Sequence, residues 1–352
     1  MKDIMDDLLT MVTDSACAVF ADHCTPALRR KAAQGNWPAD LWAAMVDIGL
    51  PYALVREERG GAGLSVEQGF LLLKVAGRYA VPLPLAETML AAWLLDSVGL
   101  PLPNGPLSLG AALADAPRLS RETGEWRLTG TLSRVPWGRD AAAVVLVAST
   151  GDGACLVAVD PAVARCDAGT NMAGEPRDTL HFQAAAVLGC APAILSADQV
   201  RATAAVARAA QIAGACEHAL ALSRDYANLR VQFGRPIAKF QAIQHSLAML
   251  ASQLAAASAA ADGGIEAVSR DFNLAAIASA KVRAGESAGS VAAIAHQVFG
   301  AIGFTQEHEL HFTTKRLWSW REEFGDESHW AERLGRHLFA MGGSRLWAEM
   351  TH

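Results

Sequence analysis

The stretch YANLRVQFGRPIAKFQAIQHSLAML, residues 226–250, interrupts a long helical pattern and then resumes it. Residues 197–229 keep a nearly unbroken helical period, and the period returns over 241–262. Gly234 and Pro236 lie between the two runs, where proline cannot continue a helix because it lacks a backbone N–H donor. The stretch therefore predicts two long helices joined by a tight turn.

The rest of the chain divides into three parts by pattern: an N-terminal helical domain over 1–106, a middle β domain over 107–192 and a C-terminal helical bundle domain over 193–352. Apolar residues at helical spacing predict helices over 41–50, 66–80, 88–99, 197–229, 241–262, 274–298 and two within 305–340. Short β-branched and aromatic runs predict strands over 126–130, 141–149, 154–160 and 179–187. The predicted fold class is mainly α with a small β-sheet domain and a C-terminal four-helix bundle.

Composition excludes several classes of function. The 352 residues carry a formal net charge of −6, which argues against nucleic acid, because phosphate binding needs a basic face. The six cysteines form no CxxC pair and no cluster with zinc spacing, so we expect no metal site and reduced thiols in the cytoplasm. No uninterrupted apolar run reaches the roughly 20 residues of a membrane span.

Three stretches together resemble sequence elements of the acyl-CoA dehydrogenases. Residues 226–250 resemble the family's flavin-binding R-x-x-F-G-x-P-(x)n-F-Q element, and QVFGAIGFTQEHELHF (297–312) resembles its Q-x-x-G-G-x-G element. LWAAMVDIGLPYALVREERGGAGLS (41–65) resembles the N-terminal helix and glycine-rich loop. The resemblance covers essentially the whole chain, in order. It implies the acyl-CoA dehydrogenase fold and FAD-dependent α,β-dehydrogenation of an acyl-CoA thioester.

The first matching element implies four FAD contacts: Arg230, Gln232, Phe233 and Gln241. The planar guanidinium of Arg230 suits two oxygens of a pyrophosphate, and Gln232 adds a neutral donor. Family precedent implies that these residues touch FAD held mainly by the neighbouring subunit.

The second element implies that Gln297 and Gly300 meet the adenosine half of FAD across a subunit contact. Ala301 stands where the family usually has a second glycine. Its methyl group is tolerated only if the backbone φ there is negative.

The middle domain departs furthest from the family pattern. In GTLSRVPWGRDA (130–141), Val135 and Pro136 take the place of the polar flavin cradle, and we expect Trp137 to pack rather than stack on flavin. The family's T-E-P-x-x-G-S-D pattern has no counterpart, and LGAALADAPRLS (109–120) occupies its place.

The family's usual base is a glutamate followed by glycine, and counting from the second element puts it on Phe324, followed by Gly325. Glu323 is the candidate base after a local rearrangement, with Glu322 and Asp326 as weaker candidates. The alternative is that these three carboxylates form a solvated acidic edge.

A second family solution places the base on the preceding helix. The matching positions, Ala204 and Ala205, carry no carboxylate, and Arg201 and Arg208 lie a turn away. Removal of an α-proton needs a carboxylate in a dry pocket, so the source of the base stays open.

Three functions are compatible with these residues. In the first, the chain is an active acyl-CoA dehydrogenase. In the second, it is a catalytically inactive FAD-binding or scaffold partner in a heteromeric acyl-CoA dehydrogenase. In the third, it is a flavin-dependent oxidase or monooxygenase of the same fold. The short middle segment and the GFTQEHELHF…FGD run look most like a subclass that acts on steroid side-chain thioesters, often as two-plus-two heterotetramers. The implied partners are the acyl-CoA thioester, a homologous subunit in a homo- or heterotetramer, and an electron-transfer acceptor protein.

Overall fold

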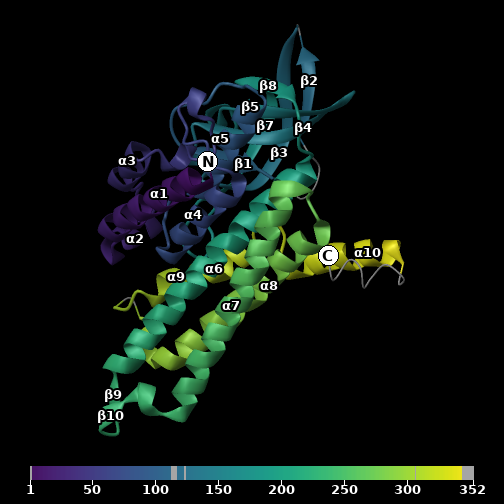
Figure 1. Cartoon of the computed structure of the whole chain (residues 1–352). Helices are drawn as coiled ribbons and strands as arrows, with labels where there is room; N and C mark the ends of the chain where they lie inside the picture. Colours follow the sequence, from purple (N-terminus) through teal and green to yellow (C-terminus); the bar gives the residue numbers. More distant parts are fainter. Residues whose placement is uncertain (1, 112–116, 123, 306, 343–352) are drawn as a thin grey trace. The chain divides into compact units, whose positions relative to one another are not determined.

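The computed structural model describes residues 2–111, 117–122, 124–305 and 307–342, and its helices and strands are drawn in Figure 1. The chain forms two compact units. The first comprises residues 1–72 and 81–204, and the second comprises residues 73–80 and 205–352. The predicted class is confirmed, because the first unit contains a β-sheet with helices and the described residues of the second unit form helices and one short hairpin.

Five helices precede the sheet: α1 (Lys2–His23), α2 (Pro26–Ala33), α3 (Ala39–Asp47), α4 (Val66–Arg78) and α5 (Leu85–Ser97). Helix α3 stops close to the predicted end, and Gly49 adopts a left-handed conformation (φ +70°) that favours glycine after a helix. Helix α5 is buried almost all round. The Thr88 hydroxyl exchanges hydrogen bonds with the backbone of Leu107, at 3.0 Å and 3.2 Å, and so joins α5 to the first strand.

The strands are β1 (Leu107–Gly110), β2 (Arg118–Glu122), β3 (Glu125–Pro136), β4 (Ala143–Thr150), β5 (Gly153–Val159), β6 (Arg165–Asp167), β7 (Arg177–Ala186) and β8 (Gly189–Pro192). They form one sheet in the order β6-β7-β3-β2-β4-β5-β8, with β1 pairing parallel to β4. All four predicted strands are present. The other four were not predicted, since they are short and two of them, β2 and β6, are largely exposed. Residues 112–116 of the 109–120 stretch lie outside the described residues.

The long helices of the second unit are α6 (Ala197–Leu229), α7 (Gln241–Arg270), α8 (Leu274–Phe299), α9 (Leu310–Arg321) and α10 (Glu327–Met341). Helix α6 has the predicted bounds. Helix α7 continues past the predicted end at 262 and includes Gly264. A side chain on Gly264 would meet the methyl of Ala280 on α8. Here glycine permits close helix packing and does not end the helix.

Alanine fills much of the bundle core. Helix α8 and the turn after it, Leu274–Phe304, are long and apolar enough to cross a membrane by length and composition. Half of that apolar window is buried inside the protein. The core helix of a helical bundle passes the same test, so the hydropathy is explained by packing.

We expect Gly214→Ala to destabilise the second unit by about 1–3 kcal/mol, through overpacking. A Cβ atom on Gly214 would lie 1.9 Å from the carbonyl oxygen of Lys74, and one on Gly77 would lie 2.1 Å from that of Gln211. The end of α4 therefore meets α6 backbone to backbone. Chemical denaturation measures the effect.

The control is Gly263→Ala, in the interior of α7, where an added Cβ would meet nothing within 4 Å. Alanine there should stabilise the helix by about 0.5–1 kcal/mol, since glycine is the poorer helix former. Equal effects of the two substitutions would show that α4 and α6 do not cross in this way.

Candidate functional site

The turn between α6 and α7 is a two-residue β-hairpin. Strand β9 (Val231–Gln232) pairs antiparallel with β10 (Arg235–Pro236), which leaves Phe233 and Gly234 as the turn. Both have positive φ, +51° and +78°, as a type I′ turn requires. Glycine accepts this conformation freely, whereas phenylalanine rarely does. The hairpin therefore holds Phe233 at its tip, where the side chain is 92% exposed.

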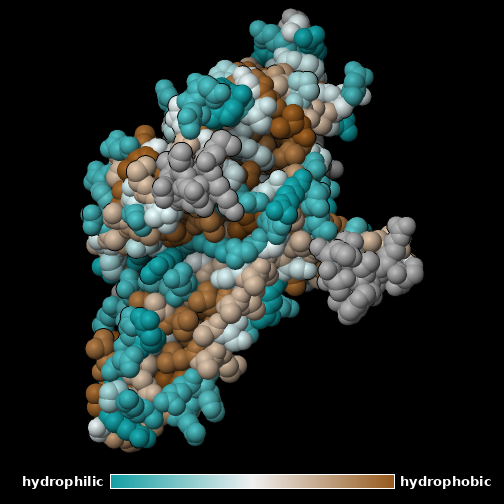
Figure 2. Space-filling model, in the orientation of Figure 1, coloured by the Kyte–Doolittle hydropathy of each residue, from teal (hydrophilic) through white to brown (hydrophobic). Residues whose placement is uncertain are grey.

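The residues predicted to contact FAD at this hairpin all face solvent in the single chain. Arg230, Gln232 and Gln241 are exposed, like Phe233. Leu229 is also exposed, and Figure 2 shows hydrophobic surface over the long helices of this unit. Exposed apolar groups beside a cation suit a surface covered by another molecule.

The second predicted element lies at the C-terminal end of α8. Gln297 and Gly300 are both exposed, and Gly300 has φ +63° with open space where a Cβ would stand. Ala301 has no positive φ, so the departure from the family's second glycine is tolerated. The rings of Tyr226 and Phe299 stack at 4.3 Å, which brings this element and the hairpin to the same end of the bundle.

In the single chain the side chains of Val135 and Pro136, which were predicted to contact the cofactor, are buried. The side chain of Val135 is 2% exposed and packs in the core of the sheet, and Pro136 is buried beside it. The hydroxyl of Ser108 donates to the carbonyl of Pro136. The pairing of β3 is irregular between Leu132 and Val135, where Arg134 has φ +57°, and Val135 shares the core of the sheet with Leu132. Trp137 packs as expected, with the Arg177 guanidinium 4.7 Å from its ring centre.

Glu323 is buried and ion-paired, contrary to a solvated acidic edge. It is 6% exposed, and its Oε2 accepts a hydrogen bond of 2.7 Å from Nε of Arg208, which is 2% exposed. Arg208 also donates to the side-chain oxygen of Gln211. Glu322 is exposed, as expected for a solvated acidic edge. Asp326 is half-buried, and its carboxylate accepts a hydrogen bond from the backbone N–H of His329 at the start of α10.

Aromatic rings enclose this ion pair. The guanidinium carbon of Arg208 lies 5.9 Å from the ring centre of Trp320 and 5.4 Å from that of Phe324. Such a pair is retained because removing either partner would leave a buried, uncompensated charge. The Glu323 carboxylate would have to leave Arg208 before it could accept a proton from carbon.

Sequence reasoning missed Arg208 as the partner of Glu323, although it placed this arginine near a possible base position. The two residues are 115 positions apart. One local signal was available: an arginine set among alanines in an apolar helix, VARAAQ (206–211), must find a buried partner if the helix lies in the core.

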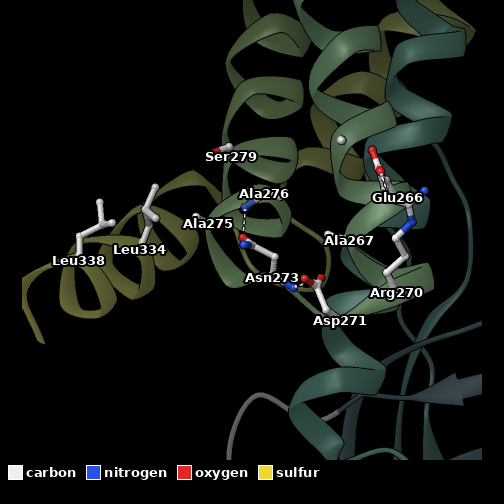
Figure 3. A pocket seen from close by; sticks show the side chains of 11 residues that line it. Glu266, Ala267, Arg270, Asp271, Asn273, Ala275, Ala276, Ser279, Leu334 and Leu338 are labelled. Carbon is white, nitrogen blue, oxygen red and sulfur yellow. Dashed lines mark hydrogen bonds and ion pairs between the residues drawn. The ribbon is translucent and has the colours of Figure 1, made fainter. Parts of the chain in front are cut away.

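Two grooves run along α10, and neither is lined by a predicted site residue. The larger has a volume of about 630 Å³. Figure 3 shows the polar side chains of Glu266 and Arg270, from the end of α7, and of Asn273, just before α8, on one side, and Leu334 and Leu338 of α10 on the other. The Asn273 side chain is engaged in capping α8 at Ala276. The groove is thus separate from the predicted cofactor contacts.

Comparisons with known proteins agree with the sequence elements. Residues 7–101 match the model of the acyl-CoA dehydrogenase N-terminal domain, and residues 200–323 match that of the C-terminal domain. Acyl-CoA dehydrogenase IpdE2 of Mycobacterium tuberculosis (strain ATCC 25618 / H37Rv) is 31% identical over 319 residues, which cover 87% of this chain and 89% of that protein.

Solved structures show the same fold. A variant of the Tcur3481-Tcur3483 steroid ACAD has a TM-score of 0.87 and 26% identity, covering 97% of this chain and 99% of that one. The ChsE4-ChsE5 complex from Mycobacterium tuberculosis has a TM-score of 0.83 and 22% identity, covering 94% and 97%.

Proposed function

The chain belongs to the acyl-CoA dehydrogenase family, and from this premise we propose that it works as the subunit without a base in a heteromeric, FAD-dependent enzyme that dehydrogenates an acyl-CoA thioester. In this proposal a homologous partner chain supplies the carboxylate base. This chain supplies contacts to FAD and the scaffold that holds them.

One observation carries the proposal. The position where the resemblance expects the base holds Phe324, and the adjacent carboxylate, Glu323, is tied to Arg208 inside the bundle. A general base must reach the substrate proton and accept it. A carboxylate held by a guanidinium in a buried pair meets neither condition without breaking that pair.

The residues present fit a dinucleotide held at a contact between subunits. Arg230 offers a fixed charge, and Gln232, Gln241 and Gln297 offer neutral donors at the exposed end of the bundle. Gly300 leaves open space for close approach to its backbone. When bound, FAD supplies the acceptor for the hydride that leaves the β-carbon.

The names of the similar proteins support a substrate class and an assembly. The Tcur3481-Tcur3483 protein is a steroid ACAD named for two components, and the ChsE4-ChsE5 structure is a complex of two. We therefore assign this chain a lipid or steroid side-chain CoA thioester as substrate, in a heterotetramer with a homologous subunit. An electron-transfer protein would take up the electrons.

The experiment compares the purified chain alone with the chain co-expressed with a homologous subunit from its genomic neighbourhood. We expect dye-coupled acyl-CoA dehydrogenation from the pair and none from the chain alone. Within the pair, Glu323→Gln should keep activity within about tenfold, because loss of a true base costs about 10²–10⁴-fold. Flavin content and the unfolding transition are measured on each sample to separate catalysis from folding.

Glu322→Gln, at the exposed neighbouring carboxylate, is the matched control and should be neutral. Two outcomes contradict the proposal. Full activity of the chain alone would remove the need for a partner's base. A loss beyond about 10²-fold in a folded, flavin-loaded Glu323→Gln enzyme would make Glu323 the base after rearrangement.

A further inference from the structure

Lys281 is a charged residue in the middle of the bundle core. It lies on α8 and is 0% exposed. Burial lowers the pKa of its ammonium to about 8, against the opposing effect of acidic neighbours, of which Glu327 is the strongest. Burying such a group is costly unless it makes specific hydrogen bonds. We therefore expect the hydrogen bonds of the Lys281 ammonium to stabilise a specific part of the fold.

The ammonium of Lys281 donates to two backbone carbonyls of one turn. Nζ lies 2.5 Å from the oxygen of Arg321 and 2.7 Å from that of Gly325. Arg321 is the last residue of α9, and the final carbonyls of a helix lack partners within it. A cation at that end also complements the negative end of the helix dipole.

The same turn is held from its other side. The Trp330 indole donates to the carbonyl of Phe324 at 3.1 Å, and Arg321 pairs with Glu327 at 2.9 Å. Phe324 has φ +57° and Gly325 has φ +99°. A Cβ on Gly325 would lie 2.7 Å from the Trp330 indole nitrogen, so the turn tolerates little displacement.

This turn, residues 321–325, contains the residues on which the base question depends. Glu323 points back to Arg208, and Phe324 and Gly325 occupy the place where the resemblance puts the base and its glycine. Lys281 touches the backbone at both ends of this turn, at Arg321 and at Gly325. Its contacts are carbonyl oxygens inside the core, where a nucleophilic role would require the amine to leave both of them.

We propose that Lys281 is a positioning residue that fixes the 321–325 turn in the geometry needed at the acyl-CoA site of the assembled enzyme. The catalytic half of this inference depends on the proposed function. The structural half, that Lys281 holds the turn, stands without it.

The test uses Lys281→Met in the assembled flavoprotein, because methionine keeps an unbranched apolar chain and removes the donors. Hydrogen exchange of the backbone amides in peptides spanning 321–327 should accelerate by at least about tenfold, with smaller changes elsewhere. In the same samples kcat should fall about 10- to 100-fold, with KM and flavin content much less affected. Lys315→Met, at an exposed lysine on α9, is the matched control and should change neither.

Lys281→Gln provides a second variant if the methionine substitution prevents folding. Its amide keeps a donor but not the charge, so it should give an intermediate exchange rate and an intermediate kcat. Unchanged exchange in the turn would overturn the proposal, whatever the activity. Faster exchange with unchanged kcat would overturn the positioning role. If the unsubstituted assembly has no dehydrogenase activity, the proposed function fails, while the exchange measurement still decides whether Lys281 holds the turn.

Discussion

Replacing Arg208 with methionine should lower the free energy of unfolding of the helical unit by about 3–5 kcal/mol, the cost of breaking a buried ion pair from one side. Arg208 and Glu323 have side chains only 2% and 5% exposed, and 2.7 Å separates the bonded atoms. Methionine fills part of the space but leaves the carboxylate without its guanidinium. Denaturant titration of the purified chain measures the change.

The double variant Arg208→Met with Glu323→Leu should recover most of this loss, since replacing a whole buried pair by apolar groups is often neutral. Arg336→Met is the control at an exposed ion pair with Glu332, and it should cost at most about 0.5 kcal/mol. A cost below about 1 kcal/mol for Arg208→Met would show that the pair is hydrated in solution. The argument against Glu323 as a base would then lose its support.

Arg230→Ala should weaken FAD binding by the assembled enzyme about 10- to 100-fold, the usual worth of a hydrogen bond to a charged group. Arg230 follows α6 directly, at the exposed hairpin that the family resemblance assigns to a pyrophosphate. The flavin-to-protein absorbance ratio after gel filtration, and titration of the apoprotein with FAD, measure the effect. Arg230→Lys should recover only part of it, because an ammonium lacks the planar fork.

Arg224→Ala is the matched control, because Arg224 is an exposed arginine on the same helix paired with Asp225. It should leave flavin content unchanged. If Arg230→Ala and Arg224→Ala retain the same amount of flavin, the hairpin does not hold the pyrophosphate. The assignment of Gln232, Phe233 and Gln241 would then need to be withdrawn with it.

Local patterns predicted most of the helices well. Residues 197–229 form one helix with the expected bounds, and the R-x-x-F-G-x-P stretch turns the chain between two helices. These features depend on periodicity and on glycine and proline, whose effects act within a few residues. The four short strands escaped prediction because their pairing partners, and not their own sequence, make them strands.

The candidate site, like the fold, could be predicted only in part from the sequence. The cofactor contacts implied by the resemblance, such as Arg230 and Gln297, remain predictions from the sequence, and their exposure at one end of the bundle is a structural result. Val135 was predicted to contact the cofactor, and only the structure shows that its side chain lies in the core, after an irregular step of β3 at Arg134 (φ +57°). The sequence alone does not give the orientation of a side chain at such a position.

The sequence by itself determined the family, the succession of a helical part, a β part and a helical bundle, and the absence of a glutamate at the usual base position. Only the tertiary structure decided that Glu323 is bound by Arg208 and that Lys281 holds the turn beside it. Those contacts join residues 115 and 44 positions apart. They exist because burial in the packed bundle forces each charge to find a partner, and the folded chain decides which partners are within reach.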